Sequence, residues 1–392
     1  MILSHKIRLY PKPKQVTDLN KACGVARYTW NWALNAWNIQ YASGMKPNAL
    51  ALKKQWNSQK PNWVYESPKD ANQQPFTHLS KAWSSFFKKK SHRPTFKKKG
   101  MHDSFYLSND KFHVENKYVR IPRIGTIKMA ETVRFEGKIM SATVSRDAHT
   151  WNISLSVDVG ENFHYNRTGN TIVGVDLGVS SAAALSTGEK LTGPKPLKKF
   201  LDLLRRRSRQ HSRKKKGSAN RRKSAMRLTR LHRKIKCQRN DFLHKLTTRL
   251  CRENQAVAVE DLNVKGLMAN HNLARAISDI GMYEFRRQLE YKSGLFKNQI
   301  VIASRWFPST KMCNSCGLIN DIPLSQRTYT CECGYVEDRD VNAAKNLRDY
   351  TRGYRGMNAC GHGGSGLMEA SSETAVVEAG ISVCAHKGSH RK

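Results

Sequence analysis

The order of apolar and polar positions divides the chain into three parts, and the first part mixes helices with strands. KIRLYP is typical of a strand, and residues 17–42 carry apolar residues at helical spacing, with Trp30, Leu34 and Trp37 on one face. Two further helical stretches follow around NALALKKQW and ANQQPFTHLSKAWSSFF. From residue 104 to about residue 159 the period changes to two, which is typical of strands. The pattern predicts a small β-barrel whose first strand is separated from the others by a helical insertion.

The second part begins near residue 166 and alternates strands with helices. NTIVGVDLGVSSAAALSTGEKL predicts a buried strand, a turn, a second strand and a hairpin turn at Thr187-Gly188-Glu189. A long basic helical region follows, then the strand QAVAVEDL, a helical stretch from about residue 277 to residue 297 and the strand QIVIAS. This alternation predicts a three-layer domain with a central sheet. From Thr351 the tail is rich in Gly and Ser without a sustained period, so we expect it to be mostly disordered.

The charge balance indicates a polyanionic partner. Among 392 residues, 69 Lys and Arg stand against 30 Asp and Glu, which gives a formal net charge of +39. No apolar run approaches the roughly 20 residues that cross a bilayer, and the first residues lack the apolar stretch of a signal peptide. We therefore expect nucleic acid as the partner, no membrane attachment and a cytoplasmic location. Nine cysteines without a secretory signal argue against a disulfide scaffold.

The longest basic run covers residues 200–240 and holds seventeen Lys and Arg with a single acidic residue. Such a run is often a solvated helix face, but one this one-sided repels itself unless phosphates neutralise it. Two shorter basic segments with aromatic residues, AWSSFFKKK and RPTFKKK, are secondary candidates, although Trp83 and Phe86 fit a core better. The candidate contacts in the long run are Arg205, Arg206, Arg207, Arg213, Lys214, Arg221 and Arg222.

Four cysteines have the spacing of a metal site. Cys313 and Cys316 form C-x2-C, and after fourteen residues Cys331 and Cys333 form C-x-C. Two close pairs separated by a loop can place four thiolates tetrahedrally around Zn²⁺. The alternative is four ordinary buried cysteines, but each pair is followed by Gly, as tight metal-binding turns favour. We predict one structural zinc site with all four positions filled.

Three carboxylates form the candidate catalytic cluster. Asp176 and Glu260 each follow an apolar strand, and Asp340 opens the helical segment VNAAKNL. A buried carboxylate is costly unless it is paired or binds a cation, so adjacent strands carrying these acids would need Mg²⁺ between them. A pair of such ions supports phosphodiester hydrolysis. The alternatives are ordinary roles: Asp340 as a helix N-cap and Asp176 as a turn residue.

The ordered set of motifs resembles the TnpB family of transposon-encoded proteins, which are related to type V CRISPR effectors. The motifs that carry the resemblance are HKIRLYPKPKQ, RPTFKKKG, GVDLGVSSAAALSTG, AVAVEDLNVKGL, PSTKMCNSCG and CECGYVEDRDVNAAKNL. The resemblance implies an α+β multidomain fold. Its expected parts are a wedge β-barrel over 1–165 with a helical recognition insertion over about 14–100, a RuvC-type nuclease domain of RNase H-like fold over 166–310 and 335–350, a zinc finger over 311–334 and the tail over 351–392.

The resemblance also implies function. It implies an endonuclease that uses a transposon-derived guide RNA to cleave target DNA beside a short adjacent motif, and that associates with the bacterial nucleoid. Carried over residue by residue, the catalytic and Mg²⁺-binding acids fall on Asp176, Glu260 and Asp340, and Asp338 is the weaker candidate for the third acid. Gln73 and Gln74 align loosely with the motif-reading segment. Two alternatives remain open: a catalytically silent RNA-guided DNA-binding protein, and an unguided nuclease of the RuvC type.

Overall fold

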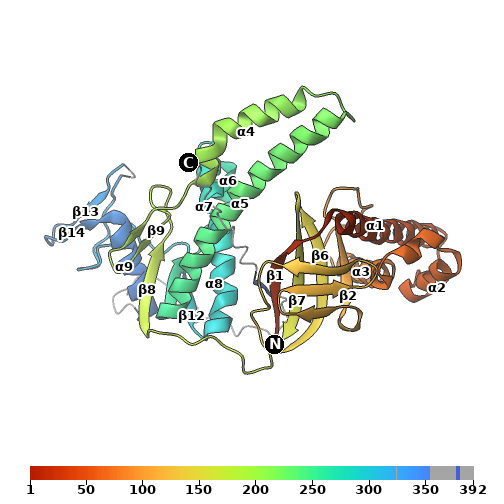
Figure 1. Ribbon diagram of the computed structural model, residues 1–392. Helices are drawn as coiled ribbons and strands as arrows, with labels where there is room; N and C mark the ends of the chain where they lie inside the picture. The colour runs from red at the N-terminus through yellow and green to blue at the C-terminus, as the bar shows by residue number, and fades with distance from the viewer. Residues whose placement is uncertain (324, 354–376, 380–392) are drawn as a thin grey trace, which may run out of the picture. The chain divides into compact units, whose positions relative to one another are not determined.

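The computed structural model describes residues 1–323, 325–353 and 377–379, and it divides into two compact units (Figure 1). The first unit contains residues 1–161 and 377–379, and the second contains residues 162–353. The predicted disordered tail lies outside the described residues, apart from Thr351–Gly353 and the strand β15. None of the helices in these described ranges combines the length and the apolar character needed to cross a membrane.

The first unit is built on a sheet in which the N-terminal strand β1 occupies a central position. β1 pairs antiparallel with β7 from Ile2 to Leu9 and with β5 at Leu9 and Tyr10, so it lies between them in the order β2-β6-β7-β1-β5-β4-β3. Among the described residues no pairing joins β2 to β3, so barrel closure stays a prediction. The strands are β1 (Ile2–Tyr10), β2 (Ser104–Ser108), β3 (His113–Glu115), β4 (Tyr118–Ile121), β5 (Gly125–Met129), β6 (Lys138–Asp147), β7 (Thr150–Asp158) and β15 (Val377–Ala379).

Helices separate β1 from the other strands of this sheet, as the sequence pattern predicted. They are α1 (Pro13–Ala42), α2 (Ala49–Gln59) and α3 (Lys69–Phe87), with a short 3-10 turn at Asn62–Glu66. Trp30, Leu34 and Trp37 are buried, and Trp37 stacks on Trp83 with ring centroids 5.6 Å apart. Trp83 is therefore a core residue. Large aromatic side chains supply much of the apolar area that the insertion buries.

The second unit contains a five-stranded sheet in the order β10-β9-β8-β11-β12. β8, β11 and β12 are parallel, and β9 and β10 form an antiparallel hairpin at one edge. α9 covers one face of the sheet, while α5 and α8 lie on the other (Figure 1). The elements are β8 (Thr171–Asp176), β9 (Ala183–Leu185), β10 (Lys190–Leu191), α4 (Pro196–Ser212), α5 (Ala219–Glu253), β11 (Asn254–Glu260), α6 (Val264–Ala269), α7 (Ala274–Ile280), α8 (Met282–Phe296), β12 (Gln299–Ala303), β13 (Thr328–Thr330), β14 (Val336–Asp338) and α9 (Arg339–Thr351).

Close packing of α9 on β8 depends on a glycine in the middle of the strand. A Cβ atom added at Gly174 would lie 1.9 Å from the carbonyl oxygen of Ala344, which is far inside van der Waals contact. The small side chains of Ala343 and Ala344 are fully buried at the same contact. The GVD segment therefore brings the helix backbone down onto the strand that ends at Asp176.

The long basic region forms two antiparallel helices rather than one continuous helical stretch. α4 ends at Ser212, and Gly217 turns the chain with a φ of +85°. Ser218 then caps α5, because its Oγ accepts a hydrogen bond from the backbone N–H of Arg221. Figure 1 shows this α4–α5 hairpin projecting beyond the sheet of its unit. The helical stretch expected over about 277–297 divides at Gly281 into the end of α7 and α8, and α6 and the β13–β14 hairpin are further elements that the periodicity did not predict.

Candidate active site and metal centre

Two parallel strands place Asp176 and Glu260 side by side. β8 and β11 pair in register with Val175 opposite Val259, so the next residue on each strand is one of the two acids. Two residues earlier, Gly174 contacts α9, and its neighbour Ala258 packs with Leu347 of the same helix. Because side chains alternate along a strand, Asp176 and Glu260 lie on the face that α9 covers.

Helix α9 brings the third acid to this face. Asp338 caps the helix: its Oδ1 accepts hydrogen bonds from the backbone N–H groups of Asp340, at 3.0 Å, and Val341, at 3.2 Å. The N-cap role that was the ordinary alternative for Asp340 is therefore filled by Asp338. Asp340 lies in the first helical turn, and its side chain is 13% exposed.

Burial dominates the electrostatics of the two strand acids, Asp176 and Glu260. Burial, followed by the charges of Glu260 and Asp340, raises the pKa of Asp176 to about 8. Burial also raises the pKa of Glu260, against the effect of a hydrogen bond from Ser309. Lys190 pairs with Asp338, and its Nζ lies 3.8 Å from Oδ2 of Asp340. Buried carboxylate oxygens that repel one another are suitable ligands for a hard cation.

Two residues near these acids were not singled out from the sequence. Ser309 is 2% exposed, and its Oγ donates to Oε1 of Glu260. Lys190 follows the Thr187-Gly188-Glu189 turn, which closes because the N–H of Leu185 donates to the carbonyl of Glu189. Nothing in the local pattern distinguishes this serine or this lysine from surface residues, because their partners come from other parts of the chain.

The four predicted cysteines form a compact cluster. Cys313 Sγ lies 3.8 Å from Cys333 Sγ, and Cys316 Sγ lies 3.6 Å from Cys331 Sγ. A tetrahedral site with metal–sulfur bonds of about 2.3 Å requires sulfur–sulfur distances of about 3.8 Å. A hydrogen bond from the backbone N–H of Cys333 is the main reason that the pKa of Cys331 is lowered to about 7, while the pKa values of the other three cysteines are raised. The cluster could hold a metal ion.

The surroundings of these cysteines differ from those of ordinary core thiols. Cys316 and Cys333 are exposed, whereas Cys23 and Cys251 are buried as small apolar groups. Gly317 and Gly334, which follow the two pairs, have φ values of +80° and +85°. A left-handed backbone at that position closes each turn, so the glycines that supported the metal prediction have the required conformation. Cys360 and Cys384 lie outside the described residues.

The acids are more widely spaced than the cysteines. Among the described residues, the cysteines are the group of three or more candidate ligands whose donor atoms all lie within 4.8 Å of one another. The structure thus brings the three acids to one face of the sheet but does not place their oxygens in such a compact group.

Two buried asparagines connect the cysteine cluster to α9. Asn342 and Asn346 lie one helical turn apart and have no exposed surface. Asn346 Nδ2 donates to the carbonyls of Ser309, at 2.8 Å, and Met312, at 2.7 Å, and Asn342 Nδ2 also donates to Met312. The N–H of Asn314 donates to Oδ1 of Asn342. A pair of amides at i and i+4 within an apolar helix face is a sequence signal for such a contact, because buried amides require partners.

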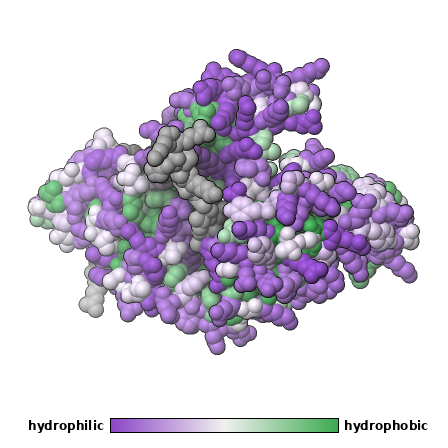
Figure 2. Space-filling model, viewed as in Figure 1, coloured by the Kyte–Doolittle hydropathy of each residue, from purple (hydrophilic) through white to green (hydrophobic). Residues whose placement is uncertain are grey.

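The α4–α5 hairpin gathers part of the predicted basic set around a hollow of about 630 Å³. Arg206, Arg207 and Lys214 line it together with Lys223 and Arg227, which were not among the predicted contacts. The residues that line it include no carboxylate. Figure 2 shows mainly hydrophilic residues over the visible surface of this hairpin.

The remaining candidates in the basic run lie elsewhere. Arg221 Nη1 donates to the carbonyls of His211 and Lys214 and so binds the C-terminal end of α4. Arg205 pairs with Asp202, while Arg213 and Arg222 are exposed. Gln73 and Gln74 are half-buried on α3, in the first unit.

Three family models match parts of the chain. Residues 154–271 match OrfB_IS605, described as "Probable transposase", residues 283–347 match the Cas12f1-like TNB domain, and residues 1–46 match a helix-turn-helix domain. In the structure, residues 1–46 contain the strand β1 and the single long helix α1.

Two relatives cover most of the chain. It is 37% identical over 353 residues to a Streptomyces pristinaespiralis protein named "Putative RNA-guided DNA endonuclease", with 87% of each protein covered. It is 31% identical over 367 residues to the Escherichia coli protein of the same description called InsQ, with 87% of this chain and 90% of InsQ covered. Among solved structures, Cas12f1 in a complex with guide RNA and target DNA aligns with a TM-score of 0.52 over 86% of this chain and 82% of its own. At 14% identity this is a likeness of fold.

Proposed function

Because the chain belongs to the TnpB family, we propose that it is an RNA-guided DNA endonuclease that cuts DNA beside a short adjacent motif. The observation that supports cleavage is the convergence of Asp176, Glu260 and Asp340 on the face of the sheet that α9 covers. This arrangement is of the kind expected for a RuvC-type nuclease, with β8 and β11 supplying two acids and α9 the third.

The residues present suit Mg²⁺ as the catalytic cofactor. Asp176, Glu260 and Asp340 would hold it through carboxylate oxygens, and because burial and then the charges of Glu260 and Asp340 raise the pKa of Asp176, a bound cation would favour its charged form. When bound, two such ions supply activation of a water molecule and stabilisation of the leaving oxygen. Ser309 orients Glu260, and Asp338 holds the first turn of α9 so that Asp340 faces the strand acids. Lys190 limits the repulsion between Asp338 and Asp340.

Zinc is the proposed ion of the cysteine cluster. Cys313, Cys316, Cys331 and Cys333 supply four sulfur ligands, and the two short sulfur–sulfur distances of 3.6 and 3.8 Å suit tetrahedral coordination. A site with four protein ligands has no open position for substrate, so its role is structural.

Guide RNA and target DNA are the proposed partners, and the bacterial nucleoid is the proposed location. The α4–α5 hairpin is suited to bind the RNA, or the duplex that RNA forms with its target, through phosphates, because five cations and no carboxylate line its hollow. Sequence reading is then left to base pairing. Gln73 and Gln74 stay candidates for contacts to bases of the adjacent motif.

The proposal is tested by co-expressing the chain with the RNA of the transposon end carrying a chosen guide. The purified complex is incubated with Mg²⁺ and a plasmid library in which the sequence beside the target is randomised. Cuts that follow the guide and require one motif would support the proposal. Guide-dependent binding without cuts would indicate a silent DNA-binding protein, and cuts indifferent to the guide would indicate an unguided nuclease.

A matched pair of variants identifies the third acid. Asp340→Asn removes a proposed metal ligand and should reduce cleavage at least about 1,000-fold, while guide-dependent DNA binding remains. Asp338→Asn preserves the cap, because Asn caps helices as well as Asp does, and it should retain most of the cleavage. The reverse order of effects would transfer the metal-binding role to Asp338.

A further inference from the structure

The connection between α3 and β2 is a basic segment without helix or strand. Residues 88–102 contain seven Lys and Arg and no acidic residue. Apart from turns near its two ends, the segment has no regular secondary structure, yet side chains of α1 hold it at several points. A connection of this kind combines high charge with a defined backbone path.

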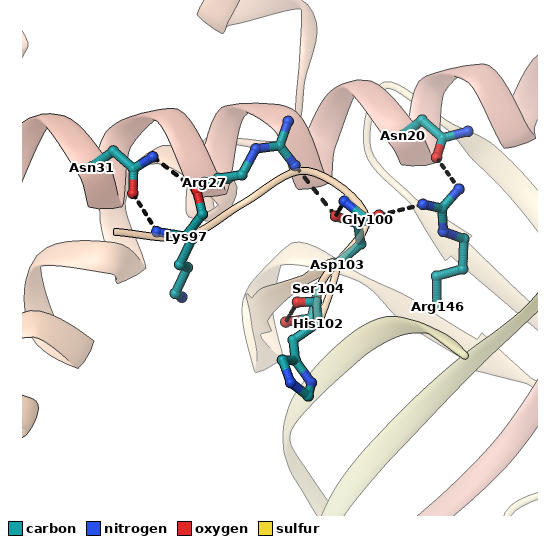
Figure 3. Close-up of polar contacts among 9 residues, drawn as sticks. All are labelled: Asn20, Arg27, Asn31, Lys97, Gly100, His102, Asp103, Ser104 and Arg146. Carbon is teal, nitrogen blue, oxygen red and sulfur yellow. Dashed lines mark hydrogen bonds and ion pairs between the residues drawn. The ribbon is translucent and has the colours of Figure 1, made fainter. Parts of the chain in front are cut away.

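Asn31 of α1 fixes the middle of this segment. Its Oδ1 accepts a hydrogen bond from the N–H of Lys97 at 2.8 Å, and its Nδ2 donates to the carbonyl of Lys97 at 3.0 Å (Figure 3). The Asn31 amide thus satisfies both backbone groups of one residue, as a neighbouring strand would. Beside it, Trp30 Nε1 donates to the carbonyl of Thr95, and Lys97 Nζ lies 4.2 Å from the centroid of a Trp30 ring.

Asp103 fixes the end of the segment. This carboxylate is 8% exposed and accepts hydrogen bonds from Arg27 of α1, from Arg146 of β6 and from the N–H of Gly100 (Figure 3). Arg146 in turn donates to Oδ1 of Asn20. Two arginines and a backbone N–H occupy the oxygens of Asp103, so this carboxylate does not neutralise the lysines before it.

The fixed backbone leaves an aromatic side chain and two lysines at the surface. Phe96 is 52% exposed, and Lys98 and Lys99 are also exposed. Within the described chain, no carboxylate pairs with Lys98 or Lys99. An exposed ring close to unpaired cations matches the chemistry of a base with its flanking phosphates.

We propose that residues 93–100, here called the strapped loop, are a preformed contact for an unpaired nucleic-acid strand. Phe96 stacks on a base, and Lys98 and Lys99 bind the neighbouring phosphates. Asn31 and Asp103 are positioning residues, because they hold the loop without touching the strand. The proposal rests on the proposed function in one respect: the strand belongs to the guide RNA or to the target DNA.

The first test measures binding of the wild-type guide RNA and of target DNA by full-length variants over a series of salt concentrations. Lys98→Ala with Lys99→Ala should lower the slope of log K against log salt by about 1.4, since each phosphate contact of a single strand contributes about 0.7. Phe96→Ala should weaken binding about 10-fold, and Phe96→Tyr should restore it. Loss of RNA binding by the free protein identifies the guide as the strand, and loss limited to DNA binding by the RNA complex identifies the target.

Two control variants distinguish binding by a preformed loop from nonspecific electrostatic attraction to the nucleic acid. Lys117→Ala with Lys128→Ala removes the same charge from exposed positions of the same unit and should change binding less than twofold. Asn31→Ala keeps every cation but releases Lys97, so binding should weaken about fivefold at an unchanged thermal midpoint. Equal losses in the two lysine pairs, or normal binding by the Lys98 and Lys99 variant, would overturn the proposal. Normal strand binding with no guide-dependent cleavage would contradict the proposed function alone.

Discussion

The cysteine cluster and the acid cluster lie in the same unit but are assembled in different ways. The four cysteines come from two short turns, each closed by a glycine with positive φ, and their sulfur atoms lie within 4.8 Å of one another. The three acids come from two parallel strands and a helix far along the chain, and their spacing is wider. Local turns therefore build the first cluster, whereas the second depends on sheet order and on the placement of α9.

The two clusters also differ in their electrostatics. A backbone N–H from the same turn lowers the pKa of Cys331 to about 7, so local structure favours one charged thiolate, while the pKa values of Cys313, Cys316 and Cys333 are raised. Burial and neighbouring carboxylates raise the pKa of Asp176 to about 8, so tertiary structure disfavours its charged form. Both clusters therefore contain groups whose charged form a bound cation would favour.

A short segment connects the two clusters. Ser309 donates to Glu260 through Oγ, and its carbonyl accepts from Asn346 of α9, while Met312 precedes the first cysteine and accepts from both asparagines. Disturbing the turn that holds Cys313 and Cys316 should therefore alter the position of α9, which carries Asp340.

Replacing Cys313 and Cys316 together by Ser should affect both metal content and cleavage. Two of four metal ligands are removed, so zinc measured by atomic emission should fall from about one per chain to well below half. Cleavage should fall at least about 100-fold, because α9 loses its support. Cys237→Ser on α5 is the matched control and should retain both zinc and cleavage. Unchanged zinc in the double variant would refute the assignment of these ligands.

Asn346→Ala should test the contact between α9 and the segment from Ser309 to Met312 without removing any metal ligand. The variant keeps all four cysteines and all three acids but leaves the carbonyls of Ser309 and Met312 without this donor. We expect cleavage to fall about 10-fold, with a higher Mg²⁺ concentration at half-maximal rate and with zinc retained. Ser309→Ala should shift the Mg²⁺ requirement in the same direction by a smaller factor. A lower rate at an unchanged Mg²⁺ requirement would argue against positioning of the acids.

Asp176→Asn should change the pH dependence of stability without Mg²⁺. The folded pKa of about 8 lies above the usual 3.8, so the folded state favours the protonated carboxyl of Asp176. This contribution to the free energy of unfolding is fully present below pH 4 and is lost as pH rises towards 8. Asn does not ionise, so the variant should unfold above wild type at pH 8, by more than the roughly 2–4 °C that correspond to 1 kcal/mol, and close to it at pH 4. Thermal unfolding in buffer without Mg²⁺ or chelator measures the difference. Added Mg²⁺ should stabilise wild type more, and a pH-independent difference would contradict this account.

Much of the element order could be predicted because it depends on neighbouring residues. The strand KIRLYP, the strands after residue 104 and the strand before Asp176 all show local apolar patterns, and the structure contains each of them. The break between α4 and α5 was missed because a uniformly basic region hides the boundary, although Gly217 and Ser218 mark it. Closure of the first sheet into a barrel is not decided by a strand pattern, because it depends on which edges meet.

By itself, the sequence determined the four-cysteine cluster, whose ligands lie within two short turns, and the two acids at strand ends, whose burial follows from the apolar runs before them. Tertiary structure alone decided that Asp338, rather than Asp340, caps α9, and that Ser309 and Lys190 contact the acids. It also decided that Arg221 binds the end of α4, whereas Lys223 and Arg227 line the basic hollow. The physical reason is distance along the chain: turns and periodicity act over a few residues, whereas these contacts depend on how separate elements pack.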